Sequence, residues 1–297
     1  MTHRTTVGAA YRAGTARLDA AGVPDAANDA AWLLLHVLGE TSRSALFVRA
    51  GEPLGDETAA RCDALLARRA RREPLQYILG SELFYGRGFC VTPDVLIPRA
   101  DTELLCVRAL EALGMARARV LDIGTGSGAL AITLALERPM ADVTAVDISE
   151  AALAVARDNA RRLGAQVRFV RSDLFAGLSP AQGAYDVIVS NPPYIVRAQV
   201  DALQPEVRCE PRLALDGGDD GLFFYRALAA QAAAYLAPGG TLLLEVGAGQ
   251  AQAVCALLAG IGPTASCADS QGIARVVWAT RQDKPAQESA GTREAAK

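Results

Sequence analysis

Asp122-Ile123-Gly124-Thr125-Gly126-Ser127-Gly128 stands between an apolar, strand-like segment, Arg119–Ile123, and a helix-like segment, Ala129–Glu137. Glycines in such a turn let the backbone bend sharply and let a ligand approach main-chain atoms that a Cβ would shield. A strand, a glycine turn and a helix in this order are typical of nucleotide-binding α/β domains. The motif therefore predicts an α/β fold with a ligand at the end of this strand.

Strand-like and helix-like segments alternate along the chain on both sides of this motif. Helical periodicity runs through residues 102–113, 150–163, 222–236 and 250–258, and strand-like apolar runs cover residues 143–147, 167–170, 185–190, 241–246, 264–268 and 274–279. Strands and helices that alternate through short turns build mainly parallel sheets with helices on both faces. The sequence therefore predicts a doubly wound α/β domain around a mainly parallel, seven-stranded sheet.

The N-terminal part of the chain has a different pattern. Apolar residues recur at helical spacing in residues 26–38 and 58–72, with almost no strand signal before about residue 73. Aromatic and β-branched residues around Gly86 and Gly88 then predict a hairpin within residues 82–93. We expect four parts: a helical bundle for substrate recognition at 1–73, a linker with a β-hairpin at 74–98, the α/β domain at 99–281, and a polar, disordered tail at 282–297.

The composition is that of an ordinary globular protein, since 51% of the 297 residues are hydrophobic and 21% are charged. A formal net charge of −3 argues against a protein whose affinity depends on neutralising many phosphates. The six cysteines lie far apart without a Cys-x-x-Cys pair and are accompanied by only two histidines, which argues against a zinc site or a disulfide framework. For this reason we expect no metal. No segment resembles a membrane span or a signal peptide, so we expect a cytoplasmic protein.

Two acidic residues extend the glycine motif towards a nucleoside site. Asp147 closes the next strand, where its carboxylate can accept hydrogen bonds from both ribose hydroxyls, and Asp173 follows the third strand near the expected adenine position. NAD-binding domains share this plan but cradle a pyrophosphate with Gly-x-Gly-x-x-Gly. Here the spacing is Gly-x-Gly-x-Gly, and Asp122 would repel a pyrophosphate but attract an ammonium and a sulfonium. The loop therefore favours S-adenosylmethionine over NAD.

A second motif, Asn191-Pro192-Pro193-Tyr194, follows the strand Tyr185–Ser190 at the carboxyl end of the predicted sheet, where such folds bind ligands. Prolines lack an N–H, so the turn offers carbonyl acceptors and few donors, and the Asn191 side-chain oxygen adds another acceptor. Each proline also restricts the residue before it, which holds the acceptors rigid. The turn is suited to an NH₂ group, on whose planar system Tyr194 can stack.

Acceptors around an NH₂ group solve a chemical problem. The nitrogen of an amide or an aromatic amine is a poor nucleophile because its lone pair is delocalised. Hydrogen bonds from this group to Asn191 Oδ1 and the Pro192 carbonyl make the nitrogen more electron-rich and favour a pyramidal transition state. Since neither histidine lies near a serine or cysteine nucleophile in the sequence, we expect direct methyl transfer without a covalent intermediate.

With further motifs, these residues resemble a known family, the protein-(glutamine-N5) methyltransferases of peptide-chain release factors (HemK/PrmC family). The resemblance covers roughly residues 73–278. Beyond the two motifs above, it includes Glu73-Pro74-Leu75-Gln76-Tyr77-Ile78-Leu79-Gly80, Leu96-Ile97-Pro98-Arg99 with Thr102-Glu103, Glu210-Pro211, Gly217-Gly218-x-Asp220-Gly221-Leu222, Pro238-Gly239-Gly240 and Glu245-Val246-Gly247.

The resemblance implies a helical N-terminal domain, a hairpin linker and a catalytic domain that uses S-adenosyl-L-methionine. It also implies that the methyl acceptor is the glutamine of a Gly-Gly-Gln motif in a release factor, which would support translation termination. The implied cofactor-binding residues are Gly124, Thr125, Gly126, Ser127, Gly128, Asp147, Asp173, Leu174 and Asn191. The implied substrate-binding residues are Asn191, Pro192, Pro193 and Tyr194, with Asn191, Pro192 and Tyr194 catalytic.

Two positions depart from the family pattern. Leu174 stands beside the adenine position, where some relatives have an aromatic residue that can stack. Ala100-Asp101 stands where the family commonly has Pro-Glu, which keeps an acid but loses a rigid bend.

Adenine-N6 methyltransferases that act on DNA or RNA are the alternative, because they share this type of turn and also polarise a planar NH₂ group. The basic cluster Arg68, Arg69, Arg71 and Arg72 could serve such a substrate, although it also fits a solvated helix face. A base-flipping enzyme would need a target-recognition domain, and the N-terminal region shows no dense basic or aromatic surface. A nucleoside-binding regulator would keep the glycine loop but would not need Asn191. The sequence therefore favours a protein substrate.

Overall fold

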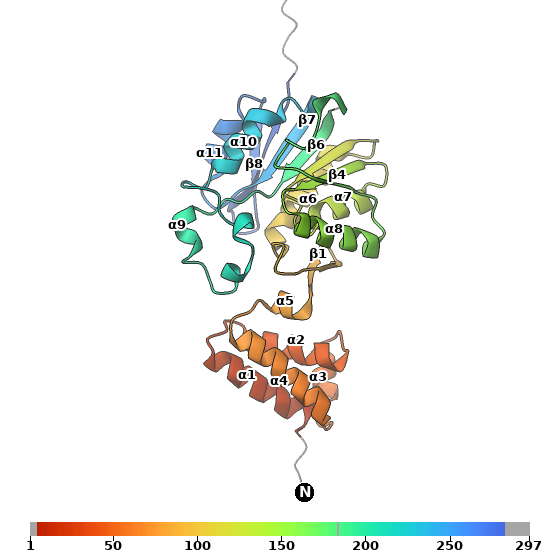
Figure 1. Cartoon of the computed structure of the whole chain (residues 1–297), viewed down its shortest axis with the longest axis vertical. Coiled ribbons are helices and arrows are strands. Elements are labelled where there is room, and N and C mark those ends of the chain that lie inside the picture. Colours follow the sequence, from red (N-terminus) through yellow and green to blue (C-terminus); the bar gives the residue numbers. More distant parts are fainter. Residues whose placement is uncertain (1–4, 183, 283–297) are drawn as a thin grey trace, which may run out of the picture.

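Seven strands form one twisted sheet in the larger part of the chain, in a computed structural model that describes residues 5–182 and 184–282 (Figure 1). The strands are β3 (Arg119–Ile123), β4 (Asp142–Asp147), β5 (Arg168–Arg171), β6 (Tyr185–Ser190), β7 (Leu236–Glu245), β8 (Thr264–Ala268) and β9 (Ala274–Thr280). Their order is β5-β4-β3-β6-β7-β9-β8, and only β9 runs antiparallel to its neighbours. The predicted mainly parallel, seven-stranded sheet is confirmed.

Helices cover both faces of this sheet, as a doubly wound fold requires. One face packs beneath α6 (Ala100–Leu113), α7 (Ala129–Glu137) and α8 (Glu150–Leu163), and the other beneath α10 (Phe223–Ala232) and α11 (Ala251–Leu258). Each face has its own apolar core, built from alternating side chains of the buried strands. The strand order reverses between β3 and β6, which places the carboxyl ends of these two strands at the position where such folds bind ligands.

The N-terminal segment forms a separate helical layer, which lies at the lower end of the molecule in Figure 1. It contains α1 (Val7–Ala20), α2 (Ala26–Leu38), α3 (Ser44–Val48) and α4 (Asp56–Ala70) around an apolar core of its own. A short helix, α5 (Leu75–Leu79), and a hairpin of β1 (Ser81–Phe84) and β2 (Arg87–Cys90) connect it to the sheet domain. The predicted hairpin is present, whereas α5 is too short for periodicity to have revealed it.

The segment after β6 reaches back to the helical bundle. It contains α9 (Arg197–Val200) and leads to Glu206, whose carboxylate accepts hydrogen bonds from Arg72 at 2.6 and 2.7 Å. Buried Arg69 lies 2.8 Å from Glu206 and 2.7 Å from Asp29 of α2. Burial opposes ionisation of Glu206, but the two arginines outweigh it and lower its pKa to about 2. Charge pairing therefore fixes the bundle against the loop that follows the proline turn.

Two features differ from the sequence predictions. The helix expected at 222–236 ends at Ala232, because Tyr235 already accepts a sheet hydrogen bond from Tyr185 and Leu236 begins β7. The strand expected at 241–246 consequently starts earlier, and Pro238-Gly239-Gly240 lies within it. The disordered tail expected at 282–297 lies outside the described residues, apart from Gln282. Within the described part of the chain, every helix is too short or too polar to span a lipid bilayer.

Candidate active site

A cavity of about 330 Å³ opens at the carboxyl ends of β3, β4 and β6. It brings both sequence motifs together, because residues from the glycine loop, from β4 and from the proline turn line it. The predicted site residues along its wall are Gly124, Gly126, Asp147, Asp173, Leu174, Asn191, Pro192 and Pro193. The Ser190 hydroxyl donates to the Ile123 carbonyl at 2.7 Å, which fixes the two motifs at a constant separation.

The glycine loop presents bare backbone to this cavity. Gly124 and Gly126 adopt φ values of 74° and 54°, and no atom lies within 4 Å of the position that a Cβ would occupy on either residue. The amides of Gly124 and Thr125 both donate to the Val146 carbonyl, at 2.9 and 3.0 Å. The loop is therefore rigid before a ligand arrives, and its glycines leave space that a side chain would fill.

Gly128 has a packing role in the same loop. A Cβ on Gly128 would lie 2.8 Å from Ile132 Cδ1 and 3.1 Å from the Ala156 Cβ of α8. Only glycine allows α7 to approach α8 this closely, as in the glycine turns of nucleotide-binding folds. Gly128 also does not line the cavities described here, whereas Thr125 and Ser127 line a smaller neighbouring cavity of about 60 Å³.

Asp122 lies beneath the glycine loop and is only 2% exposed. Its Oδ2 accepts a hydrogen bond of 2.6 Å from the Thr125 hydroxyl. Burial raises the pKa of Asp122 to about 7, even though the Thr125 hydroxyl lowers it. The carboxylate lines the smaller cavity, so it can still attract a cation there, as the sequence suggested.

Asp147 stands at the end of β4, where both of its oxygens accept backbone hydrogen bonds. Oδ2 accepts from the Gly126 amide and Oδ1 from the Ser149 amide, each at 2.9 Å. Each carboxylate oxygen has a second lone pair, so Asp147 can still accept hydroxyl groups from the cavity. Burial raises its pKa, and these backbone amides oppose that rise.

The segment after β5 carries the predicted adenine position and follows the strand that pairs with β4. Leu174 has a φ of 48°, which is a strained conformation for leucine. The Ser172 hydroxyl holds it there by donating to the Leu174 carbonyl at 2.7 Å while accepting from the Gly177 amide at 2.8 Å. Leu174 thus presents an aliphatic surface to the cavity, and the exposed Asp173 lies beside it.

The proline turn lies between the two cavities. Asn191 lines both of them, and Pro192 and Pro193 line the larger one. Asn191 Nδ2 donates to the Thr102 hydroxyl oxygen at 3.1 Å. Across residues 5–182 and 184–282, neither a side chain nor a backbone amide donates to Asn191 Oδ1. The acceptor that the sequence predicts is thus available to a ligand.

Tyr194 packs away from this wall. Its ring belongs to the apolar core on the α10 and α11 face and does not line either described cavity. A Cβ on Gly217 would lie 2.7 Å from Tyr194 Cα, and a Cβ on Gly221 would lie 2.5 Å from its carbonyl oxygen. Gln250 donates to that same carbonyl at 3.0 Å. Tyr194 therefore anchors the turn, and the glycines allow neighbouring segments to pack tightly around it.

Three buried residues that support the site have no role in the sequence prediction, and only Thr102 and Glu245 belong to a family motif. Thr102 of α6 and Glu245 of β7 are both buried, and the Thr102 hydroxyl donates to Glu245 Oε2 at 2.6 Å. Asn159 of α8 joins the hairpin to the glycine loop, because its amide donates to the Cys90 and Ser127 carbonyls. The only sequence signal for such a position is a polar residue in a helix or strand that is expected to be buried.

The fold and the two adjoining cavities define a methyltransferase of the α/β class. The methyltransferase small domain model matches residues 101–207, and the PrmC N-terminal domain model matches residues 9–80. A release factor glutamine methyltransferase of Geobacter sulfurreducens is 49% identical over 259 residues, which cover 86% of this chain and 90% of that protein. The chain belongs to the release factor glutamine methyltransferase family.

A second relative agrees with this family assignment, and a solved structure agrees with the fold. A release factor glutamine methyltransferase of Cereibacter sphaeroides is 47% identical over 275 residues, which cover 91% of this chain and 96% of that protein. The crystal structure of a methyltransferase from Pyrococcus furiosus matches with a TM-score of 0.54 and 22% identity, covering 73% of this chain and 99% of that chain. At this identity the structural match supports the fold alone.

Proposed function

We propose that this protein transfers the methyl group of S-adenosylmethionine to the side-chain amide nitrogen (N5) of the glutamine in the Gly-Gly-Gln motif of peptide-chain release factors. The observation that carries the proposal is Asn191, whose Oδ1 is available at the boundary of the two cavities. Relatives named as release factor glutamine methyltransferases match most of the chain and support the choice of substrate.

The larger cavity fits the proposed cofactor. Its volume of about 330 Å³ lies in the range of small-molecule sites, and bare backbone at Gly124 and Gly126 leaves room for close approach. Asp147 would hold the ribose hydroxyls, while Leu174 and Asp173 would flank the adenine. Asp122 would attract the positively charged end of the molecule from below the loop. When bound, S-adenosylmethionine supplies a methyl group on a positively charged sulfur.

The proline turn would bind and orient the acceptor amide. Asn191 Oδ1 would accept one N–H, and the Pro192 carbonyl would accept the other. The described residues provide no backbone donor to that carbonyl. These acceptors increase electron density on the amide nitrogen and stabilise its positive charge as it becomes pyramidal. As the N–C bond forms, the bond between the methyl carbon and the sulfur would break and leave a neutral thioether, and the nitrogen would lose its extra proton to water.

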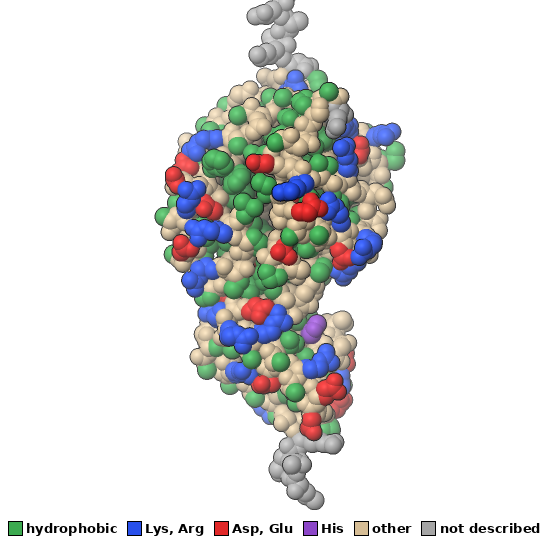
Figure 2. Space-filling model, viewed as in Figure 1, with side chains coloured by type: hydrophobic (Ala, Val, Ile, Leu, Met, Phe, Trp, Pro, Cys, Tyr) green, Lys and Arg blue, Asp and Glu red, His purple; other side chains and the backbone are tan. Residues whose placement is uncertain are grey.

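A nucleic-acid substrate has less support from the charge distribution. Three of the four arginines in the basic cluster are in ion pairs: Arg68 with Glu73, Arg69 with Asp29 and Glu206, and Arg72 with Glu206. Figure 2 shows Arg side chains interspersed with Asp and Glu over the face of the molecule in view. A surface that binds phosphates would need unpaired cations. We therefore propose a protein substrate and, because release factors act on ribosomes, a cytoplasmic location.

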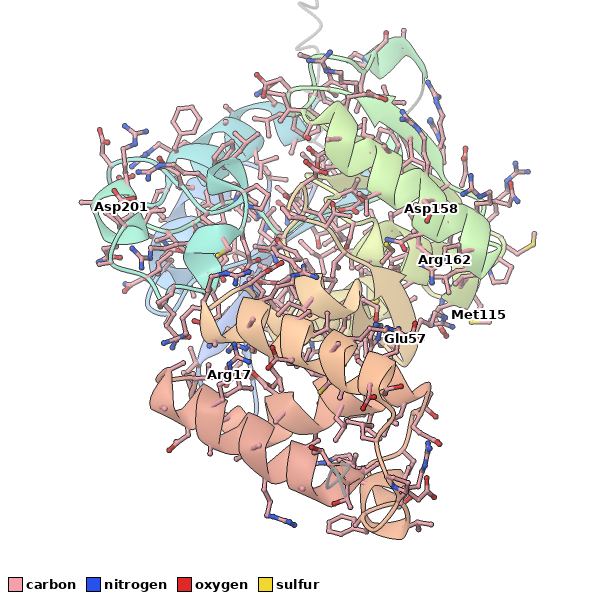
Figure 3. The ribbon with its side chains drawn as sticks, turned by 60° about the horizontal axis from the view of Figure 1, so that its bottom comes forward. Arg17, Glu57, Met115, Asp158, Arg162 and Asp201 are labelled. Atoms are coloured by element: carbon pink, nitrogen blue, oxygen red, sulfur yellow. The ribbon has the colours of Figure 1, made fainter. Side chains whose placement is uncertain are left out.

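We also propose that the helical bundle, residues 1–73, recognises the release factor. Figure 3 views the molecule from the bundle side, with Arg17 and Glu57 on the bundle and Asp201 and Asp158 on opposite flanks of the sheet domain. Phe47 and Val48 of α3 are each 83% exposed, which is a high exposure for adjacent apolar residues. The double substitution Phe47→Ser, Val48→Ser should raise KM for an intact release factor but not for a Gly-Gly-Gln peptide. Met115→Ser, at an exposed position of the sheet domain, is the matched control.

The test of the proposed activity is to locate the methyl group. The purified protein is incubated with methyl-labelled S-adenosylmethionine and either a release factor, its Gly-Gly-Gln→Gly-Gly-Ala variant, or DNA and RNA. We expect label on the glutamine of the first substrate alone, identified by peptide mass spectrometry. Label on adenine, or equal label on the alanine variant, would contradict the proposal.

A further inference from the structure

The side chain of Asn191 is tied to two buried residues from distant elements. Asn191 Nδ2 donates to Thr102 Oγ1 at 3.1 Å, and that hydroxyl donates to Glu245 Oε2 at 2.6 Å. Thr102 lies in the first turn of α6 and is 7% exposed, and Glu245 ends β7 and is 1% exposed. The three residues form one hydrogen-bonded chain that begins in the core and ends at the cavity.

The chemical nature of these groups fixes the direction of every hydrogen bond in the chain. An ionised carboxylate can only accept, so the single proton of the Thr102 hydroxyl is directed towards Glu245. The Thr102 oxygen then has only lone pairs to offer Asn191. The Asn191 amide must therefore turn its NH₂ towards Thr102, which leaves Oδ1 facing the cavity.

The opposite rotation of the Asn191 amide would be unfavourable at both ends. Its Oδ1 would face the lone pairs of Thr102, and its NH₂ would face the NH₂ of an incoming amide. In a buried site little water is available to relieve either repulsion. An asparagine without this support would divide its time between the two rotations, because its oxygen and nitrogen have nearly the same size.

We propose that Thr102 and Glu245 are positioning residues that hold the Asn191 amide with its oxygen towards the methyl acceptor. The inference rests on the proposed function, since it assigns a purpose to the orientation of Asn191 in amide methylation. We expect it to affect turnover, because both residues act through the Asn191 side chain; Thr102 lines the smaller cavity only, and Glu245 lines neither cavity.

The surroundings of Glu245 act on its ionisation in both directions. Burial and Asp101 oppose ionisation, whereas the Thr102 hydroxyl, Arg275 and Arg99 favour it. Tyr194 lies close enough to interact electrostatically with Glu245, and the Tyr225 hydroxyl donates to the Glu245 backbone carbonyl at 2.9 Å. Burial raises the pKa of Glu245 to about 7, so measurements at pH 8 examine the ionised chain.

The test compares three threonine substitutions at saturating cofactor and pH 8. Thr102→Val keeps the shape but removes the hydroxyl, Thr102→Ser keeps the hydroxyl, and Thr133→Val changes another buried threonine whose hydroxyl has no partner among the described residues. We expect Thr102→Val to lower kcat about tenfold or more with an unchanged cofactor Kd. Thr102→Ser should retain most of the activity, and Thr133→Val should match the wild type.

The outcomes separate this inference from the proposed function. Wild-type kcat in Thr102→Val, or equal losses in Thr102→Val and Thr102→Ser, would overturn the positioning role. An inactive wild-type protein would instead contradict the proposed function. If Thr102→Val does not fold, Glu245→Gln takes its place, because an amide at that position can donate as well as accept and so no longer fixes the direction. A Glu245→Gln variant with wild-type kcat at pH 8 would overturn the inference.

Discussion

Asp122 and Glu245 are two buried carboxylates that each pair with a threonine hydroxyl but lie in different surroundings. Each accepts a hydrogen bond of 2.6 Å from a threonine hydroxyl, and burial raises the pKa of each to about 7. Asp122 is bound by Thr125, three residues later in the same loop. Glu245 is bound by Thr102, which is 143 residues away and passes the contact on to Asn191.

This difference indicates two separate uses of a buried acid. The hydrogen bond between Asp122 and Thr125 stays within the glycine loop. It therefore stiffens this loop and affects only the ligand that the loop binds. The hydrogen bond between Glu245 and Thr102 is extended to the Asn191 side chain at the cavity, so it affects how the Asn191 acceptor is oriented. The comparison therefore predicts that changes around Asp122 alter cofactor affinity, whereas changes around Glu245 alter turnover.

The largest expected effect comes from Asn191→Ala, which removes the last side chain of the hydrogen-bonded series Glu245, Thr102 and Asn191. Loss of one preorganised acceptor at a reacting centre costs on the order of 3 kcal/mol, so kcat should fall about a hundredfold or more. Cofactor affinity should stay nearly unchanged. Steady-state methylation of a release factor and calorimetric titration of the cofactor measure the two quantities, and a wild-type rate would show that Asn191 does not grip the amide.

The next effect is the pH dependence of kcat. A carboxylate with a pKa raised to about 7 is ionised above that pH and protonated below it. Because only the ionised form fixes the direction of the chain, kcat should fall as the pH drops below 7 and level off about tenfold or more lower, at the loss expected for Thr102→Val.

Two variants isolate the group responsible for this pH dependence. Glu245→Gln should abolish the acidic limb of the kcat profile and give a low, flat rate, whereas Asp122→Asn should preserve the limb. An unchanged limb in Glu245→Gln would assign the titration to another group.

A smaller effect is expected for Asp147→Ala, which changes the proposed cofactor site. The substitution removes the acceptor for ribose hydroxyls and leaves the amides of Gly126 and Ser149 unpaired. Cofactor Kd should rise roughly tenfold or more, while kcat at saturating cofactor should change little. Asp142→Ala, at the exposed start of the same strand, is the control and should bind the cofactor like the wild type. An equal Kd for both variants would place the ribose elsewhere.

The sequence predicts the positions of the glycine loop and the proline turn better than the hydrogen-bonded chain from Glu245 through Thr102 to Asn191. The glycine loop and the proline turn each follow a strand directly, so their positions at one edge of the sheet could be predicted from the order of elements. The contact between Thr102 and Asn191 spans 89 residues and depends on β7 lying beside β6, with α6 packed against both. No periodicity in a single sequence encodes that order.

The role of Tyr194 shows the same limit. A tyrosine after two prolines suggested a ring that stacks on the substrate. The partly buried ring packs against the apolar core, and the glycines at 217 and 221 allow other segments to approach its backbone. Motif composition predicted which residues gather at the site. Tertiary packing decided which side chains face the cavity.

The most direct test of this account substitutes the two threonines in parallel and measures cofactor Kd and the single-turnover methylation rate for each variant. We expect opposite results: Thr125→Val weakens cofactor binding a few fold with little change in rate, and Thr102→Val lowers the rate with little change in Kd. If both substitutions reduce the same quantity, the two buried acids share one role and the separation proposed here is wrong.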